Sequence, residues 1–292
     1  MVPSFTAMKG TRLTLRRVLS GLFAIAVVAY LGAIAWLMAN ETRLVFKAVT
    51  VLGDRRPAQP YEQVEAPAEN GAAPVGRAWV LPAAAATPET PWLIFLHGND
   101  SNIGSRMNIF HCEQLRALGV NVIAPEYRGF GGLDGIPTEV GLAEDARRWY
   151  DYLRTRKQVD PKRIAIYGWS LGSAVAVTLA SRVDEAAVVL EGAPASVVAI
   201  GAQQYPMFPV RLIIRNPFES ITRIRDIHAP VLFLHSPEDA VIPFAEGRRL
   251  FDAAAPPKQF VEVTGGHVYA SQRDPNFFPT VRAFLRAQQL LP

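Results

Sequence analysis

Residues 168–172 read Gly168-Trp169-Ser170-Leu171-Gly172 and directly follow the apolar run Arg163-Ile164-Ala165-Ile166-Tyr167. That run predicts a buried strand, and residues 173–180 predict a helix. A strand that enters a helix through Gly-x-Ser-x-Gly is typical of a nucleophile elbow, in which the serine backbone is strained and the glycines admit close backbone. Ser170 Oγ would then be exposed at a helix N-terminus, where N–H groups favour a developing anion. The alternative is a turn serine that caps the helix, because the five-residue pattern also occurs by chance.

Short apolar runs alternate with helical segments on both sides of this turn. We expect strands at 92–96, 121–124, 164–167, 187–190, 231–235 and 260–263, and helices at 104–118, 138–156, 244–255 and 276–290 besides the one opening at Ser170. This alternation indicates a parallel sheet covered by helices on both faces. Upstream, residues 61–81 predict a β-hairpin with its turn near Asn70-Gly71.

A serine hydroxyl is a weak nucleophile, so Ser170 needs a general base and a group that orients that base. His267 follows two glycines after the last strand, on a loop at the strand's carboxyl end, where open α/β sheets gather their sites. His228 stands at the entry to the preceding strand and therefore at the opposite edge. His235 ends that strand, where we expect a buried, hydrogen-bonded residue. The sequence thus favours His267 as the base.

The orienting acid is sought on the loop after the strand at 231–235. Asp239 lies on this loop, and Glu238 is its nearest rival; either can also be a solvated turn residue. The order Ser170, Asp239, His267 puts all three on loops at one edge of the sheet, in the chain order expected for a nucleophile elbow.

These residues make the chain resemble the α/β-hydrolase superfamily over roughly residues 60–290. It is more specifically similar to the membrane-anchored branch, in which Leu-His-Gly-Asn follows the third strand, here Leu96-His97-Gly98-Asn99. The resemblance implies an α/β-hydrolase fold with a mostly parallel sheet of about eight strands. It also assigns one oxyanion-hole N–H to Leu171 and the other to Asn99. His97 itself is expected to be structural.

One position departs from the family pattern. Residues 127–131 (Tyr-Arg-Gly-Phe-Gly) resemble the loop that follows the fourth strand, which Asp usually precedes, whereas Glu126 stands here. We expect this change to affect loop packing more than catalysis. The loop glycines lack the spacing of a dinucleotide-binding fingerprint.

The N-terminal segment carries the net charge of the chain. Its first 40 residues hold four basic residues (Lys9, Arg12, Arg16 and Arg17) and no acidic one, while the remaining 26 basic residues balance the 26 acidic ones. The basic pI therefore gives no argument for nucleic-acid binding. Residues 18–38 are uncharged and would span ~31 Å as a helix, which matches a bilayer's hydrocarbon core. Tyr30 and Trp36 lie toward the far end, where aromatic residues suit the interface.

We therefore expect a basic cytoplasmic N-terminus at 1–17, a transmembrane anchor at 18–38, a linker at 39–60 and a catalytic domain at 61–292. The excess of basic residues before the span puts the N-terminus in the cytoplasm and the catalytic domain in the periplasm or outside the cell. A cleavable signal peptide is the competing interpretation, with Ala33-Ile34-Ala35 as a small-residue site.

Two further features complete the sequence-based picture. Cys112, the only cysteine, is expected to be a small core residue in a helix, so no disulfide or cysteine metal cluster is implied. Residues 193–225 are expected to form a short lid whose apolar stretch at 205–214 roofs the core, lines an acyl pocket or dips into the membrane surface.

Together these features predict an anchored serine hydrolase that cleaves carboxylic esters or thioesters of lipid-like acyl substrates through an acyl-enzyme. Ser170 is the expected nucleophile, His267 the base and Asp239 the orienting acid; no metal or organic cofactor is implied. A serine peptidase on the same fold is the nearest alternative, since a triad does not distinguish ester from amide. A tethered, non-catalytic binding protein is the alternative from another class.

Overall fold

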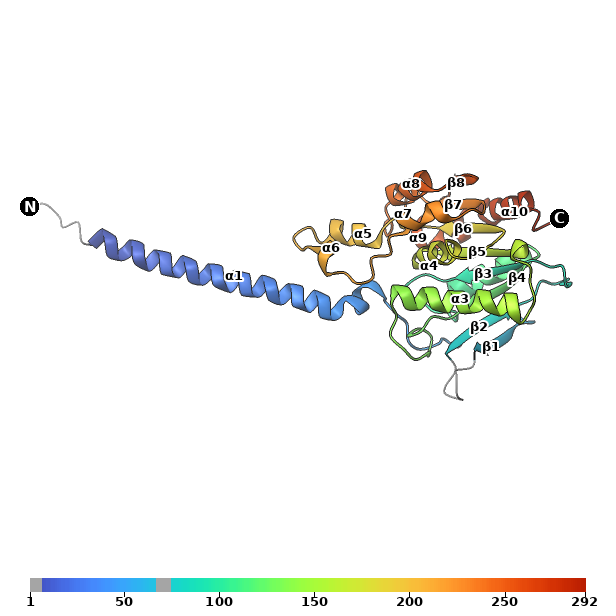
Figure 1. The fold of residues 1–292 in the computed structure, drawn as a ribbon, viewed down its shortest axis with the longest axis horizontal. Helices are drawn as coiled ribbons and strands as arrows, with labels where there is room; N and C mark the ends of the chain where they lie inside the picture. Colours follow the sequence, from blue (N-terminus) through green and yellow to red (C-terminus); the bar gives the residue numbers. More distant parts are fainter. Residues whose placement is uncertain (1–6, 67–74) are drawn as a thin grey trace, which may run out of the picture.

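The computed structural model describes residues 7–66 and 75–292, which contain an eight-stranded sheet in the order β1-β2-β4-β3-β5-β6-β7-β8 (Figure 1). The strands are β1 Glu62–Ala66, β2 Gly76–Leu81, β3 Trp92–Leu96, β4 Asn121–Pro125, β5 Ile164–Trp169, β6 Ala187–Glu191, β7 Val231–His235 and β8 Lys258–Glu262. Strand β2 pairs antiparallel with β1 and β4, and all other neighbouring pairs are parallel. The expected mostly parallel sheet and the hairpin strands are confirmed, whereas the expected turn at Asn70-Gly71 lies outside the described residues.

Helices cover both faces of this sheet. They are α2 Arg106–Ala117, α3 Glu139–Thr155, α4 Leu171–Ala180, α5 Val197–Gln204, α6 Val210–Ile213, α7 Ser220–Arg223, α8 Phe244–Ala253, α9 Gly266–Arg273 and α10 Phe277–Ala287, with 3₁₀ turns η2 Pro161–Arg163 and η3 Ile224–Asp226. Because side chains alternate along a strand, Ile94 and Leu96 pack with α3, α4 and α8. Leu93 and Phe95 pack on the other face with α2 and α10, where Cys112 is buried as expected.

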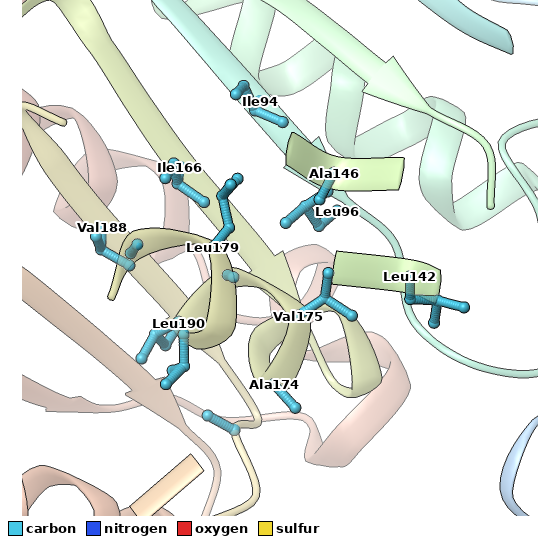
Figure 2. Packing of buried hydrophobic residues seen from close by; sticks show 14 of the residues in the cluster. Ile94, Leu96, Leu142, Ala146, Ile166, Ala174, Val175, Leu179, Val188 and Leu190 are labelled. Carbon is cyan, nitrogen blue, oxygen red and sulfur yellow. The ribbon is translucent and has the colours of Figure 1, made fainter. Parts of the chain in front are cut away.

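Helix α4 occupies the centre of the first face. All ten of its residues are buried, and Ala174, Val175 and Leu179 lie among side chains of the sheet and α3 (Figure 2). An apolar surface all round is what a helix needs when it is covered on every side. This packing fixes the N-terminus of α4 at the carboxyl edge of the sheet.

Helix α1 (Ala7–Val45) extends away from the sheet layers (Figure 1). Its part at Arg16–Val45 is long and apolar enough to cross a membrane, with a mean hydropathy of 2.3. The helix runs on to Val45, so the start of the expected linker at 39–60 is helical. Helices α5 and α6 with the turn between them, residues 197–213 (the α5–α6 segment), lie beside α1, where Tyr30 stacks on Phe208.

Candidate active site

The turn between β5 and α4 holds Ser170 at φ +55° and ψ −120°. A positive φ is strained for a residue with a side chain. The flanking glycines are required by close backbone contacts: a Cβ on Gly168 would lie 2.4 Å from the Gly172 carbonyl oxygen. A Cβ on Gly172 would lie 2.0 Å from the Leu96 carbonyl oxygen. The local geometry is therefore that of a nucleophile elbow, as the sequence pattern predicts.

The structure brings Ser170, His267 and Asp239 together in one hydrogen-bonded chain. His267 Nε2 lies 2.8 Å from Ser170 Oγ, and His267 Nδ1 lies 2.7 Å from Asp239 Oδ2. Because a carboxylate only accepts, Nδ1 carries the proton, which leaves Nε2 free to accept from the serine hydroxyl. One expectation is corrected: His267 lies in the first turn of α9 rather than on a loop, since Gly265 and Gly266 adopt positive φ and start that helix.

Asp239 is held as a carboxylate by its neighbours. Burial raises its pKa, but the hydrogen bond and charge of His267 and the N–H groups of Val241 and Ile242 outweigh burial, so the pKa lies below its ordinary value. Both N–H groups donate to Oδ1 at 2.8 Å. The rival acid Glu238 is exposed and instead accepts from the Gly265 N–H.

The other two downstream histidines lie outside this chain of hydrogen bonds. His228 is exposed. His235 is buried, and its Nε2 donates to the Ile242 carbonyl at 3.0 Å, as expected for a structural residue. Burial lowers the pKa of His235, so it stays neutral beside Asp239, whose Oδ2 is 3.5 Å away.

The loop after β3 lies against the serine. A Cβ on Gly98 would be 3.3 Å from Ser170 Cβ. Neither the Asn99 nor the Leu171 N–H has an acceptor within residues 7–66 and 75–292. The Asn99 side chain is used elsewhere: it donates to the Val45 carbonyl at 2.6 Å and accepts from the Lys47 N–H at 2.9 Å. The two backbone donors stay available, as the oxyanion assignment needs.

His97 and Glu126 hold this loop from behind. Both side chains are fully buried, and His97 Nε2 lies 2.9 Å from Glu126 Oε1. Glu126 Oε2 accepts from the Ile103 N–H at 3.1 Å. Gly131 (φ +52°) makes room for the glutamate, since a Cβ there would overlap Glu126 Oε2. His97 therefore has a structural contact, and Glu126 takes part in loop packing.

A buried polar cluster that the sequence does not predict lies next to the serine. The Ser170 N–H donates to the Glu191 carbonyl at 2.8 Å, and Glu191 Oε2 lies 2.6 Å from Tyr167 Oη and 3.0 Å from His111 Nε2. Burial and the Glu191 charge raise the pKa of Tyr167, which therefore donates as a neutral phenol. The His111 ring also stacks on Trp169, with centroids 5.0 Å apart. The one sequence feature that could have indicated this cluster is Glu191, an acidic residue directly after the apolar run 187–190.

A cavity of about 590 Å³ opens over Ser170 and His267. Its walls include Val197 and Ile200 of α5 and residues 44, 45 and 47 at the end of α1. Residues 44, 45 and 47 were expected in a linker, and nothing in their local sequence pattern indicates that they reach the site. The arrangement is suited to acyl transfer to a serine beside an apolar chamber.

The chain is similar in sequence to known hydrolases and to a protein without an assigned function. The model of the alpha/beta hydrolase family matches residues 93–285. An uncharacterized protein of Mycobacterium tuberculosis is 41% identical over 178 residues, which cover 61% of this chain and 63% of that protein. The lysophosphatidylserine lipase ABHD12 of Danio rerio is 31% identical over 229 residues, which cover 68% of this chain and 58% of the lipase. These matches thus span less than two thirds of each relative.

The fold is also found among solved structures. The Pyrococcus furiosus esterase Pf2001 superposes with a TM-score of 0.66 at 20% identity, over 83% of this chain and 98% of the esterase. At that identity the likeness concerns the fold.

Proposed function

The chain belongs to the alpha/beta hydrolase family, and from that premise we propose that it is a membrane-anchored serine hydrolase of carboxylic esters or thioesters. The observation that carries the proposal is the hydrogen-bonded chain Ser170–His267–Asp239, with Ser170 in a strained turn. The apolar cavity walls and the lipase relative favour lipid-like acyl substrates.

In the proposed reaction Ser170 Oγ attacks the acyl carbonyl carbon while its proton passes to His267 Nε2. The Asn99 and Leu171 N–H groups stabilise the oxyanion, a contribution of roughly 10²–10³ in rate for each donor. His267 then gives the proton to the leaving oxygen or sulfur, and an acyl-Ser170 ester remains. Water attacks this ester as His267 removes its proton, and return of that proton to Ser170 releases the acid. Asp239 keeps a proton on His267 Nδ1 throughout and stabilises the imidazolium that forms when Nε2 is protonated.

A fluorophosphonate probe tests the nucleophile on the full chain. We expect covalent labelling that is lost in Ser170→Ala and His267→Ala but kept in His228→Ala, the matched exposed histidine. Equal labelling of the Ser170→Ala protein would refute the assignment.

Substrate class needs a second measurement. We expect hydrolysis of acyl esters and thioesters to exceed that of aminoacyl amides, with kcat/KM rising with acyl length. Faster cleavage of the amides would favour the serine peptidase, and failure to turn over any of these substrates would favour the binding protein.

The proposed topology puts residues 1–17 in the cytoplasm and the catalytic domain at 61–292 in the periplasm or outside the cell, with 193–225 as its lid. It is supported by the candidate span and the basic residues before it. For a reporter fused after Pro292, we expect activity outside the cytoplasm and none within it. Reporter activity in the cytoplasm would show that the orientation is the reverse of the one proposed.

A further inference from the structure

A second cavity, of about 310 Å³, lies between α1 and the α5–α6 segment. Its wall is mainly apolar: Leu37 and Leu44 come from α1, Ile200 from α5 and Ile213 from α6. The volume is at the lower end of the range of about 300–1,000 Å³ for ligand pockets. An enclosure of this kind suits a hydrocarbon chain better than a polar molecule.

This second cavity adjoins the one over Ser170. Six residues line both of them: Leu44, Val45, Lys47, Val197, Ile200 and Gln204. The four apolar members come in pairs from the end of α1 and from α5. An acyl chain whose carbonyl lies at Ser170 would therefore meet mainly apolar side chains on its way toward α1.

Contacts with Tyr30 hold the α5–α6 segment at a fixed position along α1. Tyr30 stacks on Phe208 with ring centroids 5.6 Å apart, and its hydroxyl donates to the Met207 carbonyl at 2.7 Å. Tyr30 lies ~12 Å along the helix from Met38 and ~20 Å from Arg17, at 1.5 Å per residue. A hydrocarbon core of ~30 Å that begins after Arg17 therefore extends well past Tyr30. Met207, 78% exposed, then faces lipid rather than water.

Glu41 makes a second contact between α1 and the residues that follow α6. Its carboxylate is buried and accepts from the N–H groups of Arg215 and Asn216, from Arg215 Nε and from Asn216 Nδ2, at 2.7–3.0 Å. The helix and the segment after α6 are therefore joined by a buried carboxylate whose two oxygens both accept hydrogen bonds.

We propose that the cavity between α1 and the α5–α6 segment binds a lipid acyl chain that enters sideways from the bilayer, with its carbonyl at Ser170. This rests on the proposed function for the identity of the reacting group. The occupant is the acyl chain of a membrane lipid, because the mainly apolar cavity begins at Leu37, where the hydrocarbon core ends, and adjoins the cavity over the serine.

Photo-cross-linking tests the occupant without requiring catalysis. The full-length Ser170→Ala chain is placed in phosphatidylcholine nanodiscs with a lysophosphatidylcholine that carries a terminal diazirine on its acyl chain. We expect adducts within residues 37–44 and 210–214. Ile213→Trp, which fills the cavity, should reduce them about tenfold. Leu212→Trp is the matched control, since Leu212 is 85% exposed and outside the cavity wall. Val210→Phe replaces Ile213→Trp if the latter fails to fold, and equal loss in filling and control variants would overturn the proposal.

The depth of the α5–α6 segment in the bilayer is measured in a separate experiment. Met207→Cys carries a polarity-sensitive fluorophore, while the buried Cys112 stays unlabelled. We expect quenching by acyl-chain nitroxide lipids and protection from iodide, whereas Val140→Cys on α3 should behave oppositely. Iodide quenching at position 207 equal to that at 140 would overturn the proposal. Neither measurement depends on the nucleophile, so a negative fluorophosphonate result would remove the proposed reaction alone.

Discussion

At the scale of single residues, the position of one proton decides whether the site can work. Asp239 accepts from His267 Nδ1, and this contact leaves Nε2 able to accept from Ser170. An amide in place of the carboxylate would offer its N–H₂ group to Nδ1 and favour the opposite tautomer. In the proposed reaction Asp239 therefore acts on Ser170 through His267, without touching the substrate.

We expect Asp239→Asn to lower kcat for a short acyl ester by about 10⁴-fold, the effect of the wrong histidine tautomer in a serine triad. Glu238→Gln is the matched control, since Glu238 is exposed on the same loop, and it should change kcat by less than about twofold. A larger loss of kcat in Glu238→Gln than in Asp239→Asn would show that Glu238, and not Asp239, orients His267. Steady-state kinetics on both variants, with melting curves to check folding, decides the matter.

Glu185 gives a pH dependence of stability that is separate from the site. Burial, with a smaller contribution from the Asp184 charge, raises the pKa of Glu185 to about 8. The folded chain thus binds this proton more tightly than the unfolded chain, whose carboxyl titrates near its ordinary value of about 4.3. The stability is fully present below that value and falls as pH rises toward 8.

Glu185→Gln should remove this fall. At pH 9 we expect the variant to melt about 2–4 °C above the parent for each ~1 kcal/mol of unfolding free energy that the substitution restores. At pH 5 the two proteins should melt at nearly the same temperature. Glu89→Gln, at an exposed loop position, should leave the melting temperature unchanged at both pH values. A melting difference for Glu185→Gln that is the same at pH 5 and pH 9 would contradict the raised pKa.

At the scale of elements, the strand–turn–helix unit requires glycine at position 172. A Cβ there would lie 2.0 Å from the Leu96 carbonyl oxygen and 2.6 Å from that of His97, so β3 would have to move away from α4. Neither contact is with a flexible side chain. Because α4 is buried throughout, no shift of the helix relieves the overlap without opening the core.

We therefore expect Gly172→Ala to abolish fluorophosphonate labelling and to lower the melting temperature by more than about 10 °C, or to prevent folding. The matched control is Gly201→Ala in α5, where the added Cβ meets only Val210 Cγ1, at 3.3 Å, and helix propensity favours alanine by about 1 kcal/mol. Wild-type melting and labelling of Gly172→Ala would show that β3 and α4 are less tightly joined than this geometry indicates.

The sequence predicts the elements that have a local signature. The apolar runs mark β3 to β8 to within a few residues, and the elbow pattern marks α4. Helix α9 was missed because Gly265-Gly266 is typical of a loop, whereas here positive φ at both glycines starts the helix that carries His267. Glu191 was missed because its role arises from Tyr167 and His111, which reach it from other elements.

At the scale of the whole molecule, the stretch from the end of α1 to Lys47 packs into the α/β body. Phe46 is 2% exposed and packs edge-on against Phe218, with centroids 5.8 Å apart. Asn99 holds the Val45 carbonyl and the Lys47 N–H. Composition placed a linker at 39–60 because these contacts join residues more than 50 positions apart, which no local pattern reveals.

A pair of truncations separates the proposed anchor from this shared core. A chain that starts at Ala39 keeps Glu41, Phe46 and Lys47, so we expect it to hydrolyse a water-soluble short ester nearly as the full chain does. A chain that starts at Val49 loses the buried Phe46, which costs at least about 3 kcal/mol. Its melting temperature should therefore fall by roughly 6–12 °C.

The Val49 chain should also lose at least about tenfold in kcat/KM, because Asn99 no longer has its two backbone partners beside Ser170. Phe46→Ala in the full chain is the control that separates core loss from anchor loss, and it should reproduce the lower melting temperature with the anchor intact. If both truncated chains melt and react alike, residues 39–48 are a passive linker. If only the longer truncation fails, the same short stretch joins the proposed membrane helix, the loop at Asn99 and the core beneath them.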